Sequence, residues 1–221
     1  MPLPLARARA EKLLEAIAPH VTRAAIVGSI RREKPEVGDI EILAVPRMGP
    51  GDLFTNKRAD TDSIIHELRK IGSVERSGER YIKVQLGKQG RGIEWNKFKR
   101  SKIADDWPTL DLFLCHFPAQ WGTLSAIRTG PAHFSQAVVT RIRQRGWRVH
   151  RGAVWMPTAK NAVVHFEGVE PGAVLPIETI EERQYIRIPT PEEEQFFDAA
   201  GLETVPPNKR GTPAALHPKE I

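Results

Sequence analysis

The sequence predicts an α+β fold, in which helices cover one face of a mixed β-sheet and a small α/β subdomain follows. In the first half of the 221-residue chain, segments of helical periodicity alternate with apolar runs that are typical of strands. The composition changes near Pro118, which indicates two subdomains, residues 1–119 and 120–221. Hydrophobic residues make up 40% of the chain without a long unbroken run, so we expect a soluble protein with no membrane-spanning helix.

Helical and strand patterns alternate through the first subdomain. Apolar residues from Ala10 to Ile17 recur at helical spacing, and Pro19 ends that helix. A second helical pattern covers residues 61–71, with Gly72 as its expected C-terminal cap. The expected strands are residues 24–30, 39–45, 80–86, 92–98 and 109–115.

The second subdomain has shorter elements. A helical stripe runs from Phe134 to Ile142, and Gly146 can end this helix. Short strands are expected at residues 147–150, 152–155 and 162–168.

The last helix has a recognisable start. Thr190 is its expected N-cap, with Pro191 in the first turn and Glu193 as the capping-box partner. Gly201 can end this helix, and the tail from Val205 onwards is rich in proline and charge. We expect that tail to be loosely ordered.

Charge and cysteine content indicate the kind of partner and the compartment. The formal net charge of +6 favours an anionic partner, with nucleic acid as the leading case, although charge alone is a weak signal. Cys115 is the single cysteine and cannot form an internal disulfide, which fits a reducing cytoplasm. It lies in the apolar run LDLFLC, so we expect a buried thiol.

Two carboxylates share one face of an expected strand. Asp39 and Glu41 are two residues apart, so both side chains point to the same side while Ile40 faces the core. Asp111 lies opposite the leucines of its own strand. If the two strands are adjacent, three carboxylates converge, and oxygen ligands of this kind suit two Mg²⁺ or Mn²⁺ ions. The alternative is that all three are ordinary solvated strand residues.

A glycine–serine turn precedes the carboxylates. Gly28 allows the backbone to approach a phosphate closely, and Ser29 can add a hydroxyl donor. Arg32 suits bidentate contacts with phosphate oxygens, and Gly38 leaves further room directly before Asp39. A lone Gly-Ser is a weak signal, but Gly-Ser, Arg-Arg and Gly-Asp-Ile-Glu within fourteen residues form a strong one.

These motifs resemble those of the DNA polymerase X family and run in the family's order. GSIRR and GDIEI resemble its triphosphate turn and first two metal ligands, SGERYIKVQL its next strand region, and LDLFLC its third-ligand strand. WGTLSAIRTGPAHF and TPEEEQFFDAAGLETVPPNKR resemble the start of its thumb and its C-terminal end. The resemblance implies a nucleotidyltransferase palm over residues 1–119 and a thumb-like subdomain over residues 120–221.

The resemblance also implies roles for individual residues. Asp39, Glu41 and Asp111 would bind two divalent metal ions, and Asp111 would help to deprotonate the primer hydroxyl. Ser29 and Arg32 would contact the incoming triphosphate. The residues expected to bind the nucleotide are Gly28, Ser29, Arg32, Gly38, Ile127, Arg128, Thr129 and Gly130.

Several positions depart from the family's pattern. Glu41 stands where the family usually carries an aspartate. Ile127 and Arg128 replace an aromatic pair that restricts the 2′-position of the sugar, so the choice between deoxyribo- and ribonucleotides stays open. Ser135 and Val139 replace an asparagine and an arginine that contact DNA, so template dependence stays open as well.

A basic segment of the expected thumb is a candidate DNA contact. Arg141 and Arg145 are four residues apart and share a helix face, and Arg148 follows shortly after. The functional interpretation is a sequence-independent grip on phosphates. The alternative is a solvated helix face.

The leading hypothesis is a DNA-directed DNA polymerase of the X family that adds nucleotides to a primer 3′-hydroxyl, in gap filling or repair, and releases pyrophosphate. The expected partners are primer–template or gapped DNA and a nucleoside triphosphate, with two Mg²⁺ or Mn²⁺ ions as cofactors and no membrane. We expect a cytoplasmic monomer. One alternative is a template-independent terminal or small-molecule nucleotidyltransferase, and another is a non-catalytic DNA-binding module.

Overall fold

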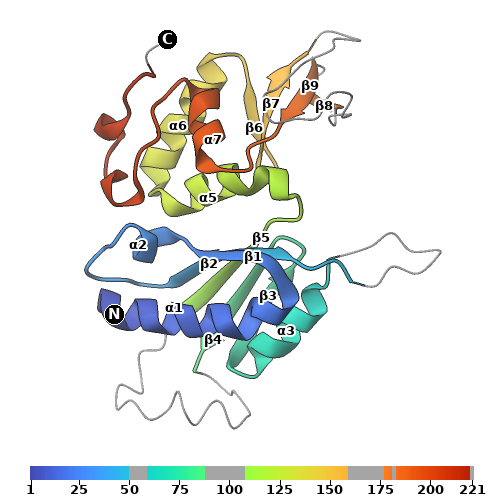
Figure 1. Ribbon diagram of the computed structural model, residues 1–221, viewed down its shortest axis with the longest axis vertical. Coiled ribbons are helices and arrows are strands. Elements are labelled where there is room, and N and C mark those ends of the chain that lie inside the picture. The colour runs from blue at the N-terminus through green and yellow to red at the C-terminus, as the bar shows by residue number, and fades with distance from the viewer. Residues whose placement is uncertain (50–58, 88–107, 159–176, 181–182, 220–221) are drawn as a thin grey trace, which may run out of the picture. The chain divides into compact units, whose positions relative to one another are not determined.

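The computed structural model describes residues 1–49, 59–87, 108–158, 177–180 and 183–219. The chain divides into two compact units, Met1–His116 and Phe117–Ile221 (Figure 1). The sequence placed this boundary after residue 119. The expected strands at residues 92–98 and 162–168 lie outside the described residues. No helix in the described part of the chain is long and apolar enough to cross a membrane.

A five-stranded mixed sheet forms the first unit, with the strand order β1-β2-β5-β4-β3. β1 (Val21–Ile26) runs antiparallel to β2 (Ile40–Pro46), and β2 runs parallel to β5 (Thr109–Leu114). β4 (Tyr81–Leu86) is antiparallel to both of its neighbours, β5 and β3 (Gly72–Gly78). The predicted mixed sheet is therefore confirmed, and its register joins strands from distant parts of the sequence.

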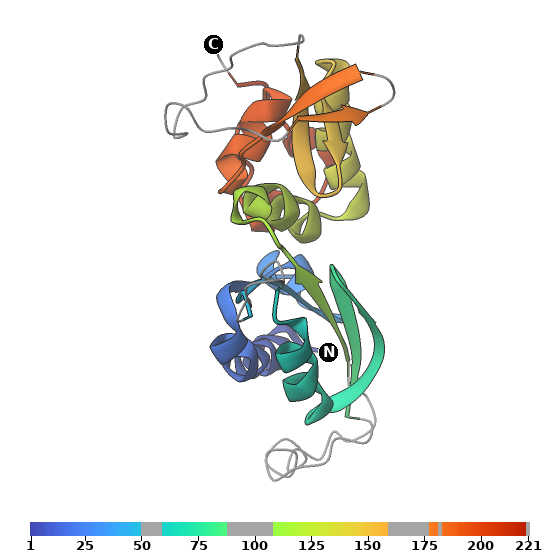
Figure 2. The ribbon, with the colours of Figure 1, turned by 90° about the vertical axis from the view of Figure 1, so that its right-hand side faces the viewer.

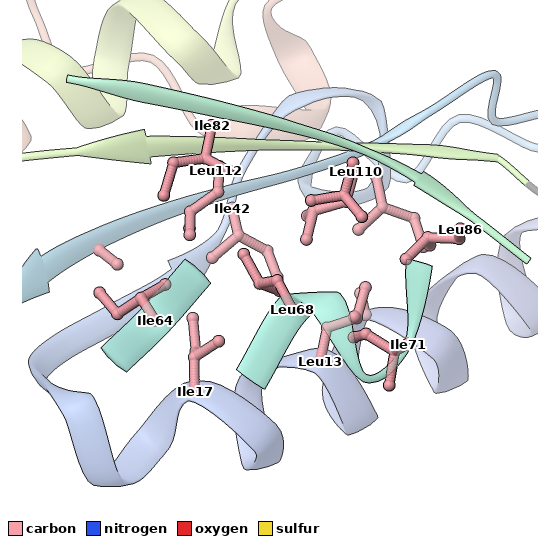
Figure 3. Packing of buried hydrophobic residues seen from close by; sticks show 14 of the residues in the cluster. Leu13, Ile17, Ile42, Ile64, Leu68, Ile71, Ile82, Leu86, Leu110 and Leu112 are labelled. Atoms are coloured by element: carbon pink, nitrogen blue, oxygen red, sulfur yellow. The ribbon is translucent and has the colours of Figure 1, made fainter. Parts of the chain in front are cut away.

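Two helices cover one face of this sheet. α1 (Leu3–Ile17), followed by the short turn η1 (Ala18–His20), and α3 (Thr61–Arg69) lie on the same side, seen in blue and teal in Figure 2. Apolar side chains of both helices point towards those of β2, β4 and β5 (Figure 3). The labelled members of this core are Leu13, Ile17, Ile42, Ile64, Leu68, Ile71, Ile82, Leu86, Leu110 and Leu112. Alternate residues on the opposite face include the charged Glu41, Lys83 and Asp111, together with the buried apolar residues Leu43 and Phe113.

Three local predictions for the first unit need correction. The strand expected at residues 24–30 ends at Ile26, because Gly28 has a φ of +67° and begins the short helix α2 (Gly28–Arg31). Gly72 does not cap α3 but begins β3. β3 was not predicted because its sequence, GSVERSG, lacks the alternating apolar residues of a half-buried strand.

The described residues of the second unit form three α-helices and an antiparallel four-stranded sheet in the order β6-β7-β9-β8. Its core is formed mainly by apolar residues of two of the helices and of β7 and β9. Its elements are η2 (Pro118–Gln120), α5 (Trp121–Thr129), α6 (Ala132–Gln144), β6 (Arg148–His150), β7 (Ala153–Pro157), β8 (Ile177–Ile180), β9 (Arg183–Ile188), α7 (Glu193–Ala200), η3 (Pro207–Lys209) and η4 (Pro213–Ala215). The sequence predicted α6, β6, β7 and α7 but not α5, β8 or β9.

α5 packs closely against the segment that leads into α7. The backbone N–H of Gly122 donates a hydrogen bond to the carbonyl of Thr190 at 2.7 Å. A Cβ atom added at Gly122 would lie 1.9 Å from the carbonyl oxygen of Glu192. Glycine is therefore required here by the close approach of two backbone segments.

The start of α7 differs from the prediction. Its N-cap is Glu192, whose backbone N–H donates to the side chain of Gln195 at 3.0 Å, and not Thr190. The Thr190 hydroxyl is instead buried and lies 2.7 Å from that of Thr123. Glu193, the predicted capping-box partner, forms an ion pair with Arg210 of the C-terminal tail. The capping prediction failed because Thr190 and Glu193 bond to residues distant in the sequence, and local capping rules do not include such partners.

The described part of the C-terminal tail, up to Lys219, packs against the second unit, so the expectation of a loose tail was wrong. Gly201, with a φ of +68°, ends α7 as predicted. The chain then buries Val205 and the whole side chain of Arg210, which forms a bidentate ion pair with Glu193 at 3.2 and 2.7 Å. A buried, paired arginine of this kind holds the tail against α7.

Candidate active site

Two of the predicted carboxylates are neighbours across parallel strands. Glu41 on β2 and Asp111 on β5 are register partners. Both side chains lie on the face of the sheet opposite the buried Ile40 and Leu110, and both are partly exposed. The sequence analysis left open whether the strands of Glu41 and Asp111 are adjacent, and the structure shows that they are.

Asp39 directly precedes β2 and lies close enough to Asp111 for the charge of Asp111 to affect its pKa. Burial raises the pKa of Asp39, the negative charge of Asp111 raises it further, and Lys83 and Arg32 oppose the shift. The folded chain thus holds the Asp39 proton more tightly than the unfolded chain, so folding stability falls as pH rises through the range of this raised pKa. When both are ionised, the carboxylates of Asp39 and Asp111 repel each other, and a bound divalent cation would remove that repulsion.

The glycine–serine turn lies against the same carboxylates. Gly28 is buried at the start of α2, and a Cβ atom added there would lie 1.8 Å from Oε2 of Glu41. The Oγ atom of Ser29 is buried and has no hydrogen-bond partner among the described residues. A buried hydroxyl without a partner costs about 1–3 kcal/mol, so we expect a partner from outside the chain, either an ordered water molecule or a bound ligand.

Gly28→Ala should destabilise the first unit and displace the Glu41 carboxylate. The positive φ alone costs a non-glycine residue about 1–2 kcal/mol, and the added methyl would also lie 3.0 Å from the Glu41 Cβ. We expect a lower midpoint in urea denaturation. Gly38→Ala is the matched control for stability, because a Cβ atom there would meet nothing within 4 Å. Equal stability of the two variants would contradict the packing described for Gly28.

Two further residues belong to this face and were not predicted from the sequence. Lys83 on β4 is the register partner of Asp111. The Tyr81 hydroxyl donates a hydrogen bond to Oδ1 of Asp111 at 2.6 Å. The period-two pattern of YIKVQL places both side chains on the polar face, but only the pairing of β4 with β5 shows that this face includes Asp111.

The donor set suits a hard divalent cation. Asp39, Glu41 and Asp111 offer only carboxylate oxygens, which are the ligands that Mg²⁺ and Mn²⁺ prefer. Within the described ranges, no three His, Cys, Asp or Glu side chains are gathered into a group able to hold a metal ion. Convergence of the three carboxylates on two metals therefore stays a prediction. Like charges are expected to stay apart until a cation compensates them.

Comparison with known proteins identifies the fold of this arrangement. Polymerase beta of Leishmania infantum, solved in a ternary P/T complex, superimposes with a TM-score of 0.64 over 95% of this chain and 76% of its own, at 14% sequence identity. The fold is polymerase beta-like. No family model matches the sequence, and no curated protein matches it. The likeness therefore rests on the arrangement of helices and strands in space, which is what the α+β prediction described.

The remaining predicted nucleotide-binding residues lie at the C-terminal end of α5 in the second unit. Ile127 packs against that unit's core, whereas Arg128 is exposed. Thr129 is fully buried, and Gly130 follows as the C-cap. The Ser135 hydroxyl donates to the carbonyl of Ile127 at 3.0 Å, so this side chain stabilises the α5–α6 turn.

The three predicted DNA-contacting arginines differ in their surroundings. Arg141 is exposed on α6. Arg145 is exposed too, but it donates to the Asp198 carbonyl at 3.4 Å, and its guanidinium lies 5.4 Å from the Trp147 ring. Arg148 lies 5.9 Å above the ring of Tyr185. Arg141 and Arg145 are thus exposed and Arg148 is half-buried, and the grip on DNA stays a prediction for all three.

Proposed function

We propose that this protein is a metal-dependent nucleotidyltransferase that works as a DNA polymerase of the X type. It adds a nucleotide to a primer 3′-hydroxyl and releases pyrophosphate, in gap filling or repair. The observation that carries the proposal is the parallel register of Glu41 with Asp111, beside Asp39 and the Gly28–Ser29 turn. A polymerase beta-like fold with this carboxylate face at its sheet supports the same reaction.

The proposed mechanism assigns each group a position relative to the reacting atoms. Asp39, Glu41 and Asp111 would hold two divalent cations, which would supply charge neutralisation for the triphosphate and lower the pKa of the attacking hydroxyl. Asp111 lies on the strand next to β2 and accepts the proton of the 3′-hydroxyl. The Ser29 hydroxyl donates to a phosphate oxygen.

Arg32 provides a fixed positive charge on the phosphate side of the site. Burial raises the pKa of Asp39, and the Arg32 charge is among the smaller influences that lower it, which supports a place for Arg32 near that carboxyl. A guanidinium in this position can hold two phosphate oxygens at once. The protein thus contributes positioning and charge, and little covalent chemistry is required of it.

Primer extension separates the proposal from its alternatives. A labelled primer, with and without a template strand, is incubated with deoxy- or ribonucleotides in Mg²⁺ or Mn²⁺, and Asp111→Ala serves as the inactive control. Extension that follows the template and is lost in the variant is the expected result. Untemplated addition would identify a terminal transferase instead. If no nucleotide is added to DNA, small-molecule acceptors are tested next, and DNA binding that ignores both Mg²⁺ and triphosphate would identify a non-catalytic module.

One observation keeps the template-independent transferase as a second candidate. The pair Ile127–Arg128 offers an aliphatic side chain packed into the core and an exposed arginine, not two aromatic rings. In the family that the sequence resembles, an aromatic pair at these two positions restricts the 2′-position of the sugar. We therefore expect weak discrimination between deoxyribo- and ribonucleotides, which the same extension assay measures.

A further inference from the structure

The side chain of Tyr81 is held rigidly beside Asp111. Tyr81 on β4 is the register partner of Phe113 on β5, two residues beyond Asp111 on the same face. Its ring stacks on that of Phe113, with 5.4 Å between centroids and 25° between planes. The hydroxyl then reaches Oδ1 of Asp111 at 2.6 Å. Stacking fixes the ring, and the ring in turn fixes the position of the hydroxyl.

A hydrogen bond of this kind restricts the carboxylate that receives it. A bond to a charged acceptor is short and strong, and it holds the Asp111 side chain in one torsion. It uses one lone pair of Oδ1 and leaves Oδ2 and the remaining lone pair of Oδ1 available to a cation. Carboxylates that bind metals are commonly oriented by such outer hydrogen bonds.

We infer that Tyr81 is a positioning residue that orients the Asp111 carboxylate for a divalent cation. This inference rests on the proposed function, because it assumes that Asp111 is a cation ligand. It goes further by assigning a role to a residue that the sequence motifs did not include. Tyr81 acts through Asp111 and needs no contact with the nucleotide or the primer.

The competing explanation is that Tyr81 only packs the sheet. Tyr81→Phe distinguishes the two, since phenylalanine keeps the ring and its stacking on Phe113 and removes only the hydroxyl. Tyr185→Phe is the matched control. The chain has two tyrosines, and Tyr185 lies buried in the second unit, so this variant makes the same chemical change outside the site.

The test measures Mn²⁺ binding to the full-length protein directly, by the electron paramagnetic resonance signal of the free ion, without nucleotide or DNA. Thermal unfolding of the metal-free proteins is recorded in parallel. Tyr81→Phe should weaken Mn²⁺ binding by about tenfold, the lower end of the usual effect of losing an outer hydrogen bond. Tyr185→Phe should leave the Mn²⁺ affinity unchanged.

The outcomes separate the inference from the proposed function. If the wild-type protein and Tyr81→Phe bind Mn²⁺ equally well, or the variant binds it more tightly, Tyr81 has no positioning role, while the proposed metal site stands. A lower unfolding temperature with unchanged Mn²⁺ affinity would show that Tyr81 only packs the sheet. If the wild-type protein leaves as much Mn²⁺ free in solution as the Asp111→Ala variant does, Asp111 binds no cation. Both the inference and the metal mechanism are then overturned.

Discussion

Asp111→Asn is expected to lower kcat for nucleotide addition by on the order of 10³-fold, because several kcal/mol of charge stabilisation are lost and each ~1.4 kcal/mol is tenfold in rate. Asparagine has nearly the same shape and can still accept the hydrogen bond of Tyr81. The change therefore removes a negative charge and a proton acceptor with little effect on packing. Single-turnover primer extension in Mg²⁺ measures the loss.

The stability of Asp111→Asn provides an independent check. The charge of Asp111 raises the pKa of Asp39, so its removal relieves repulsion in the metal-free protein. We expect the variant to be at least as stable as the wild type, although it is inactive. Asp62→Asn, which changes an exposed aspartate in the first turn of α3, is the control for the substitution itself. An active Asp111→Asn enzyme would exclude the proposed role of this carboxylate.

Arg210→Met is expected to destabilise the second unit by about 3–5 kcal/mol, which is the usual cost of removing one partner of a buried ion pair. The Arg210 side chain is 0% exposed and that of Glu193 only 10%. Besides its two bonds to Glu193, Arg210 donates from Nε to the Val205 carbonyl at 2.8 Å, and its guanidinium lies 5.1 Å from the Phe197 ring. Without Arg210, the buried Glu193 charge loses both guanidinium bonds, while the hydrogen bond from Ser125 at 2.8 Å remains.

A second ion pair supplies the comparison for this experiment. Lys219 and Asp198 are 2.6 Å apart, but their side chains are 56% and 47% exposed. Lys219→Met should therefore cost about 1 kcal/mol at most, because water already solvates both charges. Chemical denaturation of both variants measures the difference. The double variant Glu193→Leu/Arg210→Met should lose less than Arg210→Met alone, since no unpaired charge remains, and similar losses for the Arg210 and Lys219 variants would contradict a buried pair.

Local patterns predicted the elements that have a strong amphipathic period. β2, β4, β5, α3 and α6 each carry alternating or helical apolar residues, and the structure forms all of them with boundaries shifted by one or a few residues. β3 and β8 are edge strands, and β9 pairs with β8 as its antiparallel neighbour. Whether such strands form depends on the strands beside them more than on their own apolar pattern. α5 was missed because its buried positions include Gly122, Thr123 and Ser125, which do not read as an apolar stripe.

The candidate site also contains some residues that the sequence predicted and others that it did not. The chain order alone predicted that Asp39 and Glu41 share one side of a strand, because successive side chains alternate in any strand. In the structure β2 begins at Ile40, so Glu41 is a strand residue and Asp39 directly precedes the strand. The sequence pattern likewise singled out the turn residues Gly28 and Ser29. The link between Tyr81 and Asp111 was not visible, since these residues are 30 positions apart and meet only through the pairing of β4 with β5.

The sequence by itself thus determined that Glu41 and Asp111 lie opposite the core-facing residues of their strands, and which of the strongly amphipathic segments are helical or extended. Which residues bind metal and phosphate stays a prediction. Only the tertiary structure decided that β5 lies parallel beside β2 with Asp111 level with Glu41, and that Arg210 is buried against Glu193. The physical reason is the range of the interactions. Side-chain periodicity follows from the backbone of a few residues, whereas strand register and buried ion pairs depend on how distant segments pack into one core.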